Sequence, residues 1–139
     1  MVLEERLAEL GRQLVERERN QATDLNRAFE YAQKVHARLA SALDGFHALT
    51  LAEAPQLAIE LGEPGVDEKH LHAVQFDLRR GRHRAIFTIK SRGEITMVGP
   101  FRVGKTEGPC RSFPVTAEAE IEVALEELVL SFVQEAVRP

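Results

Sequence analysis

The first third of the chain has the composition and spacing of one long amphipathic helix. Residues 2–46 contain no proline, the residue that most strongly interrupts a helix interior. Near the start, leucines recur at steps of four and three residues, which is the spacing of a coiled-coil seam: Leu3, Leu7, Leu10 and Leu14. We therefore predict a helix that begins near Val2 and ends near Phe46.

A second apolar run follows towards the end of this segment. Its members are again three or four residues apart: Ala22, Leu25, Phe29, Ala32, His36, Leu39, Leu43 and Phe46. The wholly polar residues 16–21 join the two runs, and the heptad spacing is offset there by a stutter of four residues. Two helices could meet at this point, but we favour one helix, which would be ~65 Å long at 1.5 Å per residue.

A helix of that length is far longer than the core of the remaining chain, so its stripe requires an apolar partner. Because most soluble oligomers are symmetric and homodimers are the commonest of them, we expect a second copy to cover it. The predicted dimer interface consists of Leu3, Leu7, Leu10, Leu14, Leu25, Phe29 and Leu39. The alternative is a helix folded back onto its own sheet. His36 is expected to be a hydrogen-bonded core histidine rather than a ligand.

Residues 49–139 have the pattern of an antiparallel sheet followed by a helix. Period-two alternation and turn residues predict strands over 57–61, 70–78, 83–91, 94–98 and 110–115. Thr116 is the expected N-cap of a last helix, whose apolar stripe would cover one face of the sheet. The predicted fold class is α+β, with a long helix over 1–48 and, over 49–139, a meander of about four strands with a covering helix, together forming one structural domain.

The two central strands can be placed in register from their side chains. A two-residue turn at Arg80 and Gly81 would put Asp77 opposite Arg84, which is a favourable cross-strand pair. The same register gathers apolar side chains on one face: Val74, Phe76, Leu78, Ala85, Phe87 and Ile89. We therefore expect a hairpin with one buried and one solvated face.

Charge is unevenly distributed along the chain, although the net charge is only −4. The basic residues are concentrated in residues 70–115, between two acidic segments. These segments could neutralise one another in the fold, or the basic block could face an anionic partner. The candidate anion-binding residues are Arg79, Arg80, Arg82, Arg84, Arg102 and Lys105.

The stretch from Gly99 to Thr106 matches the phosphate-binding pattern of Gly, any four residues and Gly-Lys-Thr. Where this pattern binds nucleotides, the loop leads from a strand into the N-terminus of a helix. Here Gly108 and Pro109 follow, and neither favours a helix. We therefore interpret the match as coincidental, with nucleotide or small-anion binding at this loop as an alternative.

Residues with metal-binding or catalytic chemistry are sparse. His70, His72 and His83 share a strand face, but the register separates His83 from the other two, so we expect no zinc site. Cys110 is the single cysteine and is expected to be a half-buried thiol. Because no spacing of serine, histidine or carboxylate residues defines a catalytic set, we expect neither enzymatic activity nor a cofactor.

These patterns favour a non-enzymatic, homo-oligomeric interaction module. It would dimerise through the N-terminal helix and present a basic hairpin and loop to an acidic protein or another anionic partner. The main alternative is a nucleic-acid-binding dimer that uses the arginines between Arg79 and Arg84. No stretch is apolar enough to span a bilayer and no secretory signal is recognisable, so we expect a cytoplasmic protein without membrane contact.

Overall fold

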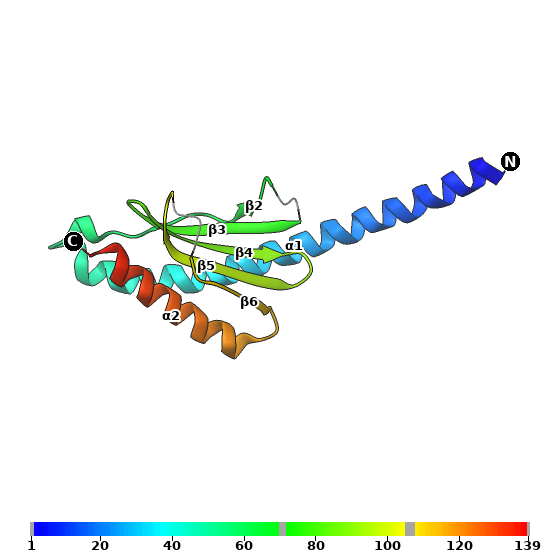
Figure 1. Cartoon of the computed structure of the whole chain (residues 1–139). Helices are drawn as coiled ribbons and strands as arrows, with labels where there is room; N and C mark the ends of the chain where they lie inside the picture. The colour runs from blue at the N-terminus through cyan, green and yellow to red at the C-terminus, as the bar shows by residue number, and fades with distance from the viewer. Residues whose placement is uncertain (1, 70–71, 105–107, 139) are drawn as a thin grey trace.

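A single helix, α1 (Val2–Thr50), dominates the computed structural model, which describes residues 2–69, 72–104 and 108–138 (Figure 1). At 1.5 Å per residue α1 is ~74 Å long. Its first half projects away from a body formed by its second half and the rest of the chain. The helix continues through the polar residues 16–21, which confirms the prediction of one helix rather than two.

The body is an antiparallel sheet covered on one face by α1 and by α2 (Glu118–Ala136). A 3₁₀ helix, η1 (Pro55–Leu57), follows α1. The strands in the described residues are β1 (Glu60–Leu61), β2 (Gly65–Val66), β3 (Ala73–Arg80), β4 (His83–Lys90), β5 (Glu94–Arg102) and β6 (Cys110–Pro114). Their order is β1-β3-β4-β5-β6, and β2 also pairs with β3. The predicted α+β class of long helix, antiparallel meander and covering helix is confirmed.

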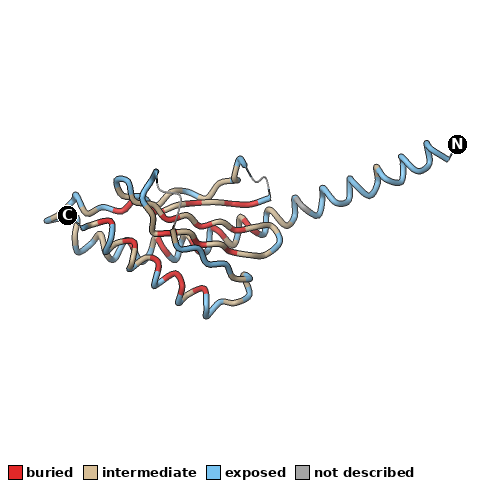
Figure 2. Tube along the Cα trace, viewed as in Figure 1, coloured by how far each residue is buried: buried red, intermediate tan, exposed pale blue. Residues whose placement is uncertain are grey.

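Alternate side chains of the central strands form the core with both helices. Phe76 of β3 stacks on Phe87 of β4 with ring centroids 5.0 Å apart. The helices contribute the buried residues Ala28, Ala32, Val35, Leu39, Leu43, Ile121, Ala124, Leu125, Leu128, Phe132 and Ala136. The six apolar residues predicted to share one face of the β3–β4 hairpin are all buried. Figure 2 shows that burial is confined to the body and that the projecting part of α1 is exposed.

The register of the β3–β4 hairpin differs from the prediction by two residues. Asp77 pairs with Ile86, and Arg84 pairs with Arg79. The turn lies at Gly81 and Arg82, where Gly81 has a φ of 58°. A positive φ at the first central position is typical of a type II′ hairpin turn and favours glycine there, so Gly81 fixes the turn one residue later. Because the shift is even, every side chain keeps its predicted face.

Several predicted boundaries are corrected. Helix α1 ends at Thr50 rather than near Phe46, and the strand expected over 70–78 is Ala73–Arg80. The expected strand over 57–61 is only Glu60–Leu61, because Pro55 starts a 3₁₀ turn and the Ile59 N–H donates to Nε2 of His47 at 3.0 Å. The strand expected over 94–98 continues to Arg102 as β5. Thr116 does not cap α2, whose N-cap is Ala117 and makes no side-chain cap hydrogen bond.

Candidate interaction surfaces

The projecting part of α1, residues 2–23, is called the arm from here on. Four of its leucines are between 45% and 62% exposed: Leu3, Leu7, Leu10 and Leu14. The other predicted interface residues belong to the body, since Leu39 is 3% exposed in the core and Leu25 and Phe29 pack against it. The stripe that is available to a second copy is therefore restricted to the arm.

Arg80 is a structural anchor rather than a free cation. Its Nη2 donates to the carbonyl of Gln56 at 2.8 Å, and its Nη1 donates to the carbonyl of Ala136. These bonds tie the β3–β4 hairpin to the segment after α1 and to the end of α2. Such hydrogen bonds to carbonyls far along the chain leave no signal in the local sequence.

Arg79 and Arg84 are also occupied, because both contact the carboxylate of Asp77. Arg84 Nη2 donates to Asp77 Oδ2 at 2.7 Å, and Arg79 Nε lies 3.4 Å from the same oxygen. Arg79 also approaches Glu60 at 3.9 Å. Gly62 leaves room for this carboxylate, since a Cβ there would lie 2.3 Å from Asp77 Oδ1. Two members of the predicted basic cluster, Arg79 and Arg84, are thus paired with carboxylates within the sheet.

Two of the predicted anion-binding residues, Arg82 and Arg102, lie at adjacent hairpin ends. Arg82 in the β3–β4 turn and Arg102 at the end of β5 are exposed, and no ion pair forms for either among the described residues. The ends are held together because His83 pairs with Arg102 and the Val103 N–H donates to the Arg82 carbonyl at 2.7 Å. Lys105 lies outside the described residues.

The segment that matches a phosphate-binding pattern begins inside strand β5. Gly99 belongs to β5 and has a φ of 127°. A Cβ at this position would lie 2.9 Å from the Cα of Ala85, so glycine is needed for close packing of β5 on β4. The next element described is strand β6, which begins at Cys110, as expected from Gly108 and Pro109 after the match. Lys105 and Thr106 themselves lie outside the described residues.

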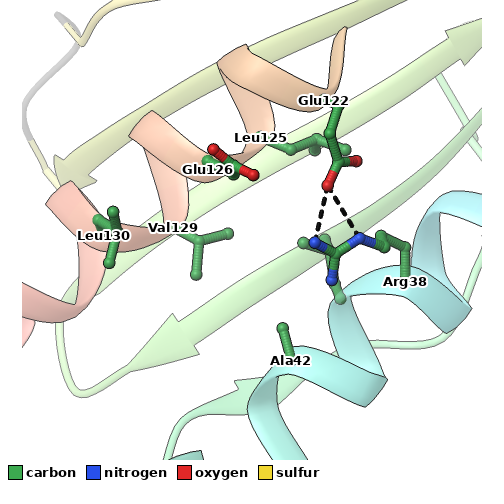
Figure 3. Close-up of a pocket in the computed structure, with 8 residues that line it drawn as sticks. Arg38, Ala42, Glu122, Leu125, Glu126, Val129 and Leu130 are labelled. Atoms are coloured by element: carbon green, nitrogen blue, oxygen red, sulfur yellow. Dashed lines mark hydrogen bonds and ion pairs between the residues drawn. The ribbon is translucent and has the colours of Figure 1, made fainter. Parts of the chain in front are cut away.

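A shallow groove of about 210 Å³ separates α1 from α2 on the side away from the sheet (Figure 3). Leu39, Ala42, Leu125, Val129 and Leu130 give it an apolar lining. Arg38 closes one end by donating to Glu122 Oε1 from Nε at 3.0 Å and from Nη2 at 2.7 Å. These hydrogen bonds raise the pKa of Arg38 above its ordinary value.

Arg111 pairs with Glu127 of α2 at 2.7 Å, so part of the basic block neutralises the acidic last helix.

His36 is packed in the body but is not hydrogen-bonded at Nε2, contrary to the prediction. Its ring meets Phe76 edge-on at 5.5 Å, and its buried Nε2 lies 3.8 Å from the Glu63 carboxylate. His72 and His83 lie at opposite ends of the hairpin, and His70 is outside the described residues. The described part of the chain holds no group of three metal-binding side chains.

Cys110 is exposed rather than half-buried, because β6 is an edge strand.

In the ranges that the structure describes, no helix combines the length and apolar character needed to cross a bilayer. Comparisons of the chain with protein-family models, curated proteins and solved structures found no significant match.

Proposed function

We propose that this protein is a non-enzymatic interaction module that self-associates through its arm. The observation that carries the proposal is the row of four exposed leucines on a helix that extends beyond its own body. Heptad-spaced leucines bury their side chains against a second helix in coiled coils. The stripe spans only two heptads and offers less than the ~800 Å² per partner of a standard interface, so we expect a dimer that dissociates on dilution.

The paired hairpin ends are the proposed surface for an acidic or otherwise anionic partner. Arg82 and Arg102 provide exposed guanidinium groups on adjacent turns. A nucleic-acid-binding role is less well supported, because Arg79, Arg80 and Arg84 are engaged within the protein. Neutralising several phosphates requires several available cations.

Light scattering of the full chain over a range of concentrations tests the self-association. We expect the molar mass to rise towards twice that of the monomer, and the variant with both Leu7→Glu and Leu10→Glu to remain monomeric. Glutamate preserves helix propensity, so the arm should stay helical. The control is Val123→Glu, which changes an exposed apolar residue on α2 and should not alter the mass. A parent protein that is monomeric at every concentration would contradict the proposal.

A further inference from the structure

The leucines of the arm lie on the same side of α1 as the residues that pack against the sheet. Eighteen residues make five turns of an α-helix, so residues 18 apart have the same angular position. Leu14 precedes the buried Ala32 by 18 residues, and Leu10 precedes the buried Ala28 by 18. The exposed stripe and the core stripe therefore form one line, and the body lies on the side to which the leucines point.

This shared face makes parallel pairing of two arms incompatible with the bodies. Packed helices have axes 8–10 Å apart, so the partner helix would lie directly over the leucine stripe. In a parallel pair, its continuation would enter the space that the first copy's sheet occupies over Ala28, Ala32 and Leu39. Because α1 is one unbroken helix, there is no joint at which the two copies could diverge.

The charge on the stripe also opposes a parallel pair. Arg17 precedes the buried Val35 by 18 residues and so lies on the stripe, one step after Leu14. Parallel pairing would bring two Arg17 guanidinium groups together across the seam. In an antiparallel pair centred on the leucines, Arg17 lies beyond the partner's leucines.

We propose that two copies pair their arms antiparallel, with the bodies at opposite ends. In this register Leu3 faces Leu14 of the partner subunit and Leu7 faces Leu10 of the partner subunit. All four leucines of each copy are then covered by leucines, and each body lies past the end of the partner's arm. This inference rests on the proposed self-association and adds its direction.

A distance measurement between spin labels distinguishes the two directions. The label is placed at Arg27→Cys in a Cys110→Ser background, because Arg27 is exposed and lies outside the leucine stripe. The antiparallel register places the two labelled residues ~55 Å apart along the axis, from 1.5 Å per residue. A parallel pair would hold them within ~30 Å, from the interaxial distance and the label length.

Disulfide trapping gives a second readout on the full chain. A disulfide needs Cα atoms within ~7 Å, so in the Cys110→Ser background Leu3→Cys should form a dimer when mixed with Leu14→Cys and not by itself. Arg12→Cys is the control, since Arg12 lies on the opposite side of the helix and should not crosslink. Light scattering is run on each sample.

The outcomes separate the direction from the association. A long Arg27 distance together with the mixed disulfide supports the antiparallel pair. A dimer with a short Arg27 distance, or one in which Leu3→Cys crosslinks to itself, overturns the direction and leaves self-association standing. A dimer in which the arm binds elsewhere, such as the groove between α1 and α2, gives no mixed disulfide and also overturns it. A monomer in every sample overturns both.

Discussion

Asp77 and Arg84 form an ion pair of 2.7 Å although they are not opposite each other in the β3–β4 hairpin. Arg84 reaches diagonally to Asp77 across the strands, because its direct partner is Arg79. The carboxylate thus lies between two guanidinium groups that would otherwise repel each other. Diagonal neighbours on a sheet are within the reach of long side chains.

Asp77→Asn should destabilise the body because it removes the charge between Arg79 and Arg84. The Asp77 side chain is 15% exposed, and hydrogen bonds to charged groups contribute about 1.5–3 kcal/mol each. We expect a loss of ~1–3 kcal/mol in the free energy of unfolding, measured by urea denaturation. Glu53→Gln is the control at an exposed carboxylate that forms no ion pair among the described residues. An unchanged midpoint for Asp77→Asn would show that the ion pair contributes no net stability.

Arg80→Ala and Arg82→Ala should behave differently, although both remove one arginine from the same hairpin. Arg80 donates to the carbonyls of Gln56 and Ala136, so its loss removes both bonds and leaves the part-buried Ala136 carbonyl without this donor. We expect Arg80→Ala to lose ~1–3 kcal/mol and Arg82→Ala to stay within ~0.5 kcal/mol of the parent. Thermal unfolding measures both. Equal effects would contradict the assignment of Arg80 as an anchor.

Leucines of α1 should affect stability according to their position. Leu39→Ala removes a core side chain and should lose ~2–5 kcal/mol in the free energy of unfolding. Leu7→Glu with Leu10→Glu should leave the unfolding of the body within ~0.5 kcal/mol at concentrations where the parent is monomeric. Denaturation followed by near-ultraviolet circular dichroism reports the body. A large loss in the arm variant would mean that the arm packs on its own body.

Gly45→Ala and Gly99→Ala should change stability in opposite directions. Gly45 lies in α1 with open space where a Cβ would be, so alanine should stabilise the helix by ~0.5–1 kcal/mol. At Gly99 the φ of 127° and the contact with Ala85 both oppose a side chain, and the loss should exceed ~1 kcal/mol. Thermal unfolding of the two variants compares them. Tolerance of Gly99→Ala would contradict the packing of β5 on β4.

Glu94 should contribute a pH-dependent part of the stability. Its hydrogen bond from Lys90, followed by that from Arg92, lowers the pKa of Glu94 below its ordinary value. A lowered folded-state pKa stabilises the fold above the unfolded-state pKa of ~4.3, and this contribution is lost as the pH falls through the folded value. The stability difference between the parent and Glu94→Gln should therefore be present at pH 6 and disappear in acid. Carboxyl carbon NMR gives the pKa directly, and a value above the ordinary one would refute the argument.

The sequence predicts the elements of this fold well because their signals are local. Heptad spacing defines α1, and alternation of Val74, Phe76 and Leu78 defines the buried face of β3. The hairpin register was wrong because the position of Gly81 in its turn depends on φ, which composition does not specify. The shift preserved the faces because it was even.

The candidate basic surface was predicted less well, since partners far along the chain decide which arginines are available. Nothing near Arg80 in the sequence indicates that the end of α2 lies beside it. Similarly, Leu39 has the same spacing as the arm leucines, and only the position of the sheet shows that it is covered. The sequence pattern identifies the apolar face of the helix, whereas the tertiary structure determines which part of that face the sheet covers.

The absence of a break in α1 has a mechanical consequence. A rigid rod that passes from an exposed end into a packed core fixes the direction of everything attached to it. A partner that binds the arm therefore also fixes the orientation of the body, including the sheet face that the helices leave open and the hairpin ends at Arg82 and Arg102. The unbroken helix also fixes the distance between those hairpin ends and the site at which the arm is bound.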